Sequence, residues 1–161
     1  MQDEVLESLV REQMLLTRFA LQNVAPKNRE VRLDRSAVIL LSRLRMQGPM
    51  SVAELADAFD VDVSTIHRQT TAAMKAELLE RIPDPDGGVA RKLRPTEQGM
   101  HRLNAELEAR KTGYERLLAD WTTEEIDAFV TQLRRFNQSI EADRGKSWPR
   151  EPADQIGRAH V

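Results

Sequence analysis

The sequence predicts a mainly α-helical fold that carries one small β-hairpin. Apolar residues recur at three- and four-residue spacings through most of the 161 residues, which is the periodicity of amphipathic helices. Two Ser/Thr-x-x-Glu patterns, beginning at Ser51 and Thr122, mark helix N-termini because such pairs form capping boxes. Residues 83–88 (PDPDGG) can only form a turn, and short extended segments flank them.

The N-terminal part of the chain is expected to form two helices. The first covers residues 3–22, and residues 25–28 (APKN) end it. Its apolar stripe consists of Val5, Leu6, Leu9, Val10, Leu16, Phe19 and Ala20. The second helix begins after Asp34, its expected cap, and ends at Gly48 and Pro49. Its core face is made of Val38, Ile39, Leu41 and Leu44.

A helix-turn-helix is expected next. Ser51 and Glu54 cap its first helix, whose apolar positions are Val52, Leu55, Ala56 and Phe59. Residues 60–63 (DVDV) interrupt the helical pattern, and Asp62 or Ser64 is able to cap the second helix. That helix is expected from Ser64 to about Glu77. Its buried side is predicted to hold Ile66, Thr70, Ala73, Met74 and Leu78.

The outward side of that second helix carries hydrogen-bonding side chains with few carboxylates among them. They are Ser64, Thr65, His67, Arg68 and Thr71. A recognition helix presents this kind of face to base edges and phosphates in the major groove of DNA. Arg68 is the strongest candidate, because a guanidinium can donate two hydrogen bonds to a guanine edge. The pattern therefore implies double-stranded DNA as a partner.

The remaining elements complete a winged helix and two further helices. Strands are expected at residues 79–82 and 89–94, the second ended by Pro95, with a short pairing segment near Met50. Thr96 is expected to cap a helix over residues 97–119. The last helix starts with the Thr122 capping box. Its apolar residues are Ile126, Phe129, Val130, Leu133, Phe136 and Ile140. Residues 145–161 lack periodicity and are expected to form a flexible tail, with Trp148 as a possible partial anchor.

This pattern divides the chain into three regions. Residues 1–30 and 97–144 are expected to form a helical dimerisation region, 31–96 the winged helix-turn-helix, and 145–161 the tail. A winged helix of about seventy residues is too small to cover the apolar stripes of three further helices. We therefore expect a homodimer, which also places two recognition helices about one turn of DNA apart.

Composition excludes several classes of protein. The chain has no cysteine, so disulfides, thiol redox switches and thiolate metal sites are excluded. The three histidines, His67, His101 and His160, show no metal-binding spacing, and no zinc site, cofactor or enzymatic activity is expected. The sequence has no apolar run long enough to cross a membrane and no signal-peptide pattern at its start, so a cytoplasmic location is expected.

Charge is distributed unevenly although the net charge is only −2. Residues 64–102 hold seven basic and five acidic side chains, whereas residues 104–144 hold six basic and nine acidic ones. This distribution is compatible with a basic working face on an acidic body.

In order and spacing, the motifs of residues 3–143 resemble those of the MarR family of dimeric winged-helix transcription factors. The matching segments are SVAELA at 51–56, STI at 64–66, LER at 79–81, DPD at 84–86, and the Leu93-x-x-Thr96-x-x-Gly99 pattern. The resemblance implies a repressor that binds a pseudo-palindromic operator and is released by a lipophilic or phenolic effector. It also implies that the wing lies against DNA, with Arg91 and Arg94 as the candidate contacts beside the recognition helix.

The wing departs from the family pattern. Counted back from Thr96, the positions of the family's acidic residue and wing arginine hold Gly87 and Val89. A second interpretation therefore stays open, in which the chain is a dimeric protein-interaction module without sequence-specific DNA binding. The retained basic residues Arg68, Arg91 and Arg94 favour the DNA-binding interpretation.

Overall fold

The computed structural model describes residues 1–150, apart from the side chains of Ala20 and Leu21, so the predicted role of Ala20 in the first apolar stripe lies outside the described residues. The elements in chain order are α1 (Gln2–Val24), α2 (Arg35–Gln47), α3 (Val52–Phe59), α4 (Val63–Lys75), β1 (Leu79–Ile82), β2 (Lys92–Pro95), α5 (Glu97–Leu117) and α6 (Thr123–Arg144). This order confirms the predicted mainly helical fold with one hairpin.

The chain forms two compact units. One consists of Met1–Arg32 and Asn104–Trp121, and the other of Leu33–Leu103 with the described part of Thr122–Val161. This partition differs from the predicted regions, because α6 and the first turns of α5 group with the winged helix. The partition does not show which helices a second copy would contact. The assignment of residues 1–30 and 97–144 to dimerisation therefore stays a prediction.

In the first unit, the end of α1 lies close to α5. Gly113 of α5 permits this approach, because a Cβ atom there would lie 3.0 Å from both the Cα and the carbonyl oxygen of Val24. The Arg116 guanidinium also donates to the carbonyl of Asn23 at 3.0 Å. On α5 the fully buried carboxylate of Glu106 accepts a hydrogen bond from Arg110 at 2.9 Å.

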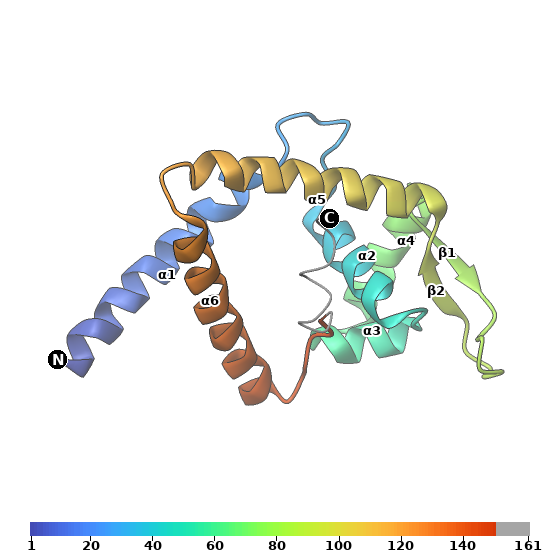
Figure 1. The fold of residues 1–161 in the computed structure, drawn as a ribbon. Coiled ribbons are helices and arrows are strands. Elements are labelled where there is room, and N and C mark those ends of the chain that lie inside the picture. The colour runs from blue at the N-terminus through green and yellow to red at the C-terminus, as the bar shows by residue number, and fades with distance from the viewer. Residues whose placement is uncertain (151–161) are drawn as a thin grey trace. The chain divides into compact units, whose positions relative to one another are not determined.

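The second unit has an aliphatic core to which α2, α3, α4, the hairpin and the start of α5 all contribute. Its fully buried side chains include Leu40, Leu41, Leu44, Leu55, Ile66, Leu93 and Leu103. Figure 1 shows β1 and β2 side by side, with the hairpin loop projecting at the edge of the α2–α4 cluster. This arrangement leaves the outer side of α4 and the hairpin loop free of the core.

Local capping sets the boundaries of the helix-turn-helix. The predicted capping box of α3 is present, since Ser51 Oγ accepts from the Glu54 amide and the Glu54 carboxylate accepts from the Ser51 amide, both at 3.1 Å. Asp60 ends α3 in the left-handed conformation. Asp62 is the N-cap residue of α4, but its side chain makes no capping hydrogen bond. The helix begins at Val63 and ends at Lys75, slightly earlier at both ends than predicted.

The hairpin is shorter on its return side than predicted. β1 pairs with β2 in an antiparallel register from Leu79 opposite Pro95 to Ile82 opposite Lys92. Residues 83–91 therefore form the loop, and the prediction that residues 89–91 belong to the second strand is wrong. The prediction that this strand ends before Pro95 is also wrong, because β2 includes Pro95. The expected short pairing segment is confirmed as a single bridge between Met50 and Leu93.

The caps of the last two helices follow the sequence. Thr96 Oγ1 accepts from the Gly99 amide at 2.9 Å at the start of α5. Thr122 and Glu125 form the predicted capping box of α6, and Gly145 ends that helix in the left-handed conformation. Within residues 1–150, no helix combines the length and the apolar character needed to cross a membrane.

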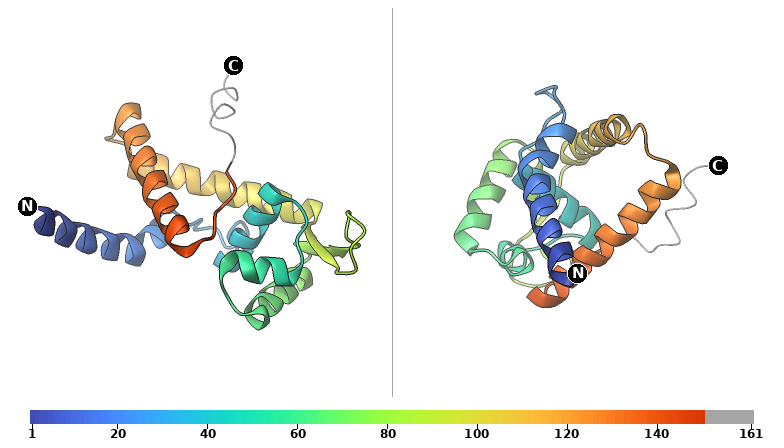
Figure 2. Two further views of the ribbon diagram at one scale, coloured as in Figure 1. Left: turned by 90° about the horizontal axis from the view of Figure 1, so that it is seen from below. Right: turned by 90° about the vertical axis from the view of Figure 1, so that its left-hand side faces the viewer.

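The segment after α6 packs against the helix-turn-helix. The Trp148 ring stacks on Phe59 at a centroid distance of 5.8 Å, and the Lys146 ammonium pairs with Asp57 at 2.6 Å. Figure 2 shows this segment, just before the grey trace, running back from the end of α6. Residues 146–150 thus differ from the predicted flexible tail, because these contacts hold them. Residues 151–161 of the predicted tail lie outside the described residues.

Candidate nucleic-acid interface

The inner side of α4 fixes the orientation of this helix. Ile66, Thr70 and Ala73 are buried, and the Thr70 hydroxyl donates to the Ile66 carbonyl at 2.9 Å. Because these three residues follow helical spacing, they leave one continuous side of α4 on the surface. Met74 is only half-buried, so the predicted buried side is confirmed except at that position.

The five predicted recognition residues lie along the outer side of this helix. Ser64, His67, Arg68 and Thr71 are exposed, and Thr65 is half-buried. Within residues 1–150, none of these side chains makes a hydrogen bond or ion pair that would occupy its polar atoms. The surface therefore offers hydroxyl, imidazole and guanidinium groups that remain available to a partner.

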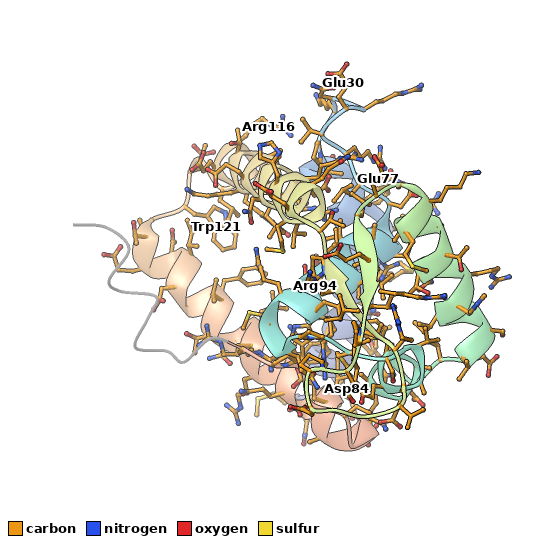
Figure 3. All side chains as sticks on the ribbon, turned by 90° about the vertical axis from the view of Figure 1, so that its right-hand side faces the viewer. Glu30, Glu77, Asp84, Arg94, Arg116 and Trp121 are labelled. Atoms are coloured by element: carbon orange, nitrogen blue, oxygen red, sulfur yellow. The ribbon has the colours of Figure 1, made fainter. Side chains whose placement is uncertain are left out.

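The two predicted wing arginines lie in different environments. Arg91 is exposed in the loop before β2 and has no ion-pair partner within the described part of the chain. Arg94 lies on β2, directly opposite Glu80, and its Nε donates to the Glu80 carboxylate at 2.6 Å. Figure 3 shows Arg94 on the hairpin between Glu77 and Asp84. A phosphate would therefore have to compete with Glu80 for Arg94, but not for Arg91.

Lys92 connects the wing to α3. Its ammonium binds the Glu54 carboxylate and lies 3.9 Å from Asp84, and its side chain is only 13% exposed. The hydrogen bond between the two groups lowers the pKa of Glu54 and raises the pKa of Lys92. Glu54 thus has two functions, as the capping residue of α3 and as the anchor of the wing.

Gly87 and Val89, the two positions at which the wing departs from the family pattern, are exposed in the hairpin loop. Val89 is fully exposed, and Gly87 has a φ of 81°, a conformation that favours glycine. An acidic side chain at position 87 would therefore be strained, whereas an arginine at position 89 has room.

Among the histidines, His67 and His101 are exposed on α4 and α5, and His160 lies outside the described residues.

Two features near the interface were not predicted from the sequence. Lys92 has no local pattern that distinguishes it from Arg91 and Arg94, and only the strand register turns it toward Glu54. The contact between Trp148 and Phe59 joins residues far apart in the chain, and the sequence signal was limited to an aromatic residue in a polar tail.

Known proteins resemble the chain in both sequence and fold. The MarR family profile matches residues 33–87. The HTH-type transcriptional regulator YxaD of Bacillus subtilis strain 168, described as uncharacterized, is 37% identical over 108 residues, which cover 67% of this chain and 76% of YxaD.

Solved structures agree over a larger part of the chain. RV1404 from Mycobacterium tuberculosis superposes with a TM-score of 0.67 at 22% identity and covers 92% of this chain and 97% of its own. A MarR family protein from Bacillus stearothermophilus gives a TM-score of 0.66 at 24% identity, over 83% of this chain and 96% of its own. At these identities the structures establish the shared fold. Together with the sequence matches, they show that the chain belongs to the MarR family of helix-turn-helix transcriptional regulators.

Proposed function

We propose that this regulator is a homodimeric repressor that binds a pseudo-palindromic operator and is released by a small lipophilic or phenolic effector. The outer side of α4 is the observation that carries the proposal. Its polar side chains are exposed and unoccupied within residues 1–150, while Ile66, Thr70 and Ala73 hold the helix from behind. A rigid helix with an uncommitted polar side is what reading of base edges requires.

Arg68 is assigned the central role on this surface. It is flanked by His67 and lies one turn from Ser64 and Thr71. One arginine and several shorter donors therefore lie along the same side of the helix and can face a single groove of DNA. The predicted contacts Ser64, Thr65, His67, Arg68 and Thr71 form this group. In the wing, Arg91 is the better candidate for a phosphate contact. Arg94 contributes only if its ion pair with Glu80 is replaced by one with a DNA phosphate.

Apolar surfaces on two helices support the homodimer. On α1, eight large apolar side chains are at least 46% exposed: Val5, Leu6, Leu9, Val10, Met14, Leu15, Leu16 and Phe19. Helix α6 has no buried residue, and Phe129, Val130, Phe136 and Ile140 are each more than 40% exposed. Patches of this kind mark protein interfaces, and a second copy presents the same helices in a self-complementary way.

Release by an effector follows from linkage. A ligand that binds better to a dimer with a different spacing of the two recognition helices lowers operator affinity by that difference in binding free energy.

Selection from random duplex DNA tests the proposal. The full chain is incubated with a random library at fixed salt, and bound duplexes are amplified and sequenced. Enrichment of a two-fold symmetric sequence is expected. Enrichment of no sequence, together with a stable dimer in sedimentation analysis, would instead favour the protein-interaction module.

A further inference from the structure

The hairpin loop is closed at its base by two carboxylates that share one ammonium group. Lys92, the first residue of β2, binds the Glu54 carboxylate of α3, and its ammonium lies 3.9 Å from Asp84 near the start of the loop. The side chains of Lys92 and Asp84 are only 13% and 11% exposed. One ammonium thus joins both ends of the loop formed by residues 83–91 to the first helix of the helix-turn-helix.

The loop is also folded around Asp84, which Figure 3 labels. The Oδ1 atom of Asp84 accepts from the Asp86 amide at 2.9 Å, and its carbonyl accepts from the Gly87 amide at 3.0 Å. A Cβ atom at Gly88 would lie 2.2 Å from Asp84 Oδ2, the oxygen that faces Lys92, so the loop backbone passes close to this carboxylate. Asp84 therefore sets the shape of the loop, and Lys92 holds Asp84 in place. We call Glu54, Lys92 and Asp84 the wing anchor.

The wing anchor is poorly suited to contact DNA directly. The Lys92 ammonium is engaged by two carboxylates and its side chain is nearly buried, whereas its neighbour Arg91 is exposed and has no ion-pair partner within residues 1–150. Carboxylates beside a DNA-binding surface repel phosphates, so they weaken binding unless they contribute in another way. Holding the wing in one shape is such a contribution, because an ordered loop loses less conformational entropy on binding.

We propose that the wing anchor positions the wing for DNA binding, holding it on α3 so that Arg91 contacts a phosphate beside the groove that α4 enters. Its three members are positioning residues that act through Arg91 and make no contact with DNA. The chain thereby orders its wing without the acidic residue and arginine of the family pattern. This role rests on the proposed DNA-binding function.

A matched pair of glutamate variants tests the role, because the side chains of Glu54 and Glu80 are about equally exposed, at 48% and 44%. Binding of the full chain to the selected operator is measured by mobility shift at several salt concentrations. Glu54→Gln should weaken binding about tenfold, the effect of losing one hydrogen bond to a charged group. Glu80→Gln, which releases Arg94, should bind at least as tightly as the unmodified chain. Loss of a negative charge should by itself tighten DNA binding, so weaker binding of Glu54→Gln identifies positioning.

Two further quantities connect the effect to Arg91. The slope of log affinity against log salt should fall by about one in Glu54→Gln and in Arg91→Ala, because both variants lose the same phosphate contact. Arg91→Ala should weaken binding about tenfold in the unmodified chain but less than about twofold in the Glu54→Gln background. Glutamine can also complete the capping box of α3, and thermal unfolding checks that it does. If Glu54→Gln is less stable, Asp84→Asn replaces it, because this loop position caps no helix and its change should weaken binding in the same direction.

Equal or tighter binding of Glu54→Gln would overturn the proposal. Tighter binding would in addition assign Lys92 to direct phosphate contact, because the variant frees its ammonium. An undiminished effect of Arg91→Ala in the Glu54→Gln background would overturn the proposal as well.

A measurement without DNA separates this role from the proposed function. If the unmodified chain enriches no duplex, the proposed function fails, and the order of the wing is measured by the heteronuclear NOE of the Gly87 and Gly88 amides. A lower value in Glu54→Gln than in Glu80→Gln supports the wing anchor. Equal values in the two variants would overturn it.

Discussion

The Trp148 ring stacks on Phe59 with centroids 5.8 Å apart and an interplanar angle of 17°. This contact ties the segment after α6 to the end of α3, directly before the turn that leads into α4. It is supported by Arg144, which donates to the Phe59 carbonyl at 3.3 Å. The end of the last helix and the helix-turn-helix are thus one packed structure.

We predict that the two rings stabilise the fold jointly. In a double-mutant cycle with Phe59→Leu and Trp148→Leu, the coupling free energy should be about 0.5–1.5 kcal/mol, the range for aromatic pairs. Denaturant unfolding of the four proteins measures it. If the two single effects simply add, the rings do not interact, and the segment is held by its other contacts, such as the Lys146–Asp57 ion pair and the hydrogen bond from the Trp148 amide to Glu141.

Acid should release the same segment. The Arg150 guanidinium, followed by the Trp148 amide, lowers the pKa of Glu141 to about 2 from an ordinary value of 4.5. Because the pKa is lower in the folded state, the stabilisation is complete above pH 4.5 and is lost as the pH falls toward 2. Trp148 fluorescence, measured in a Trp121→Phe background, should therefore change in this window.

The matched control is Glu141→Gln, which cannot titrate. Its Trp148 emission should already resemble the released form at neutral pH and should change little between pH 4.5 and 2. Far-UV circular dichroism on the same samples distinguishes local release from global unfolding. An identical acid profile in both proteins would show that Glu141 does not hold the segment.

The sequence predicts best the features that depend on neighbouring residues. The capping boxes of Ser51 with Glu54 and of Thr122 with Glu125 were both predicted and are both present, because their atoms are three residues apart on one helical turn. The hairpin was predicted, but its start at Lys92 depends on the register with Ile82, which local composition does not encode.

Long-range features were beyond sequence reasoning. Arg43 lies in α2 and is buried, and its guanidinium is 5.1 Å from the centre of the Trp148 ring, a contact between residues that are far apart in the chain. The start of the tail was predicted at residue 145, which is too early, because residues 146–150 contact the distant helix-turn-helix. On the recognition surface, four of the five predicted positions are exposed and Thr65 is half-buried. The exposed positions follow from the buried spacing of Ile66, Thr70 and Ala73.

Glycine at position 77 should stabilise the protein. Glu77 follows Ala76, the C-cap of α4, and adopts a φ of 60°, where a side chain costs about 1 kcal/mol relative to glycine. Glu77→Gly should therefore raise the free energy of unfolding by up to about 1 kcal/mol. The carbonyl of this residue, which accepts from Thr96 Oγ1 at 2.6 Å, is retained. Glu77→Ala, which removes the charge but keeps the strain, should give no increase, and an equal gain in both variants would assign the effect to charge.

Gly99 should tolerate no side chain. A Cβ atom at this position of α5 would lie 2.1 Å from the carbonyl oxygen of Leu78 and 2.9 Å from its carbonyl carbon. Both are backbone atoms next to β1, so relief requires a shift of the helix against the hairpin. Gly99→Ala should destabilise the fold by about 2–3 kcal/mol, as overpacked core substitutions do. Gln98→Ala, at the exposed neighbour, should be nearly neutral in the same thermal unfolding assay, and equal stabilities would refute the close approach.

Arg68 is predicted to make the strongest single contribution to DNA binding. It is exposed on α4 and has no partner within residues 1–150, so its guanidinium is free to pair with a base edge or a phosphate. Arg68→Ala should weaken binding to the selected operator by about 1–3 kcal/mol in a mobility-shift assay at fixed salt. If the contact is to a phosphate, the slope of log affinity against log salt should fall by about one.

Arg135→Ala, an exposed arginine of α6 outside the predicted contact set, should leave both quantities unchanged. Unchanged affinity in the Arg68 variant would remove this residue from the interface and leave the shorter side chains of α4 to read the DNA.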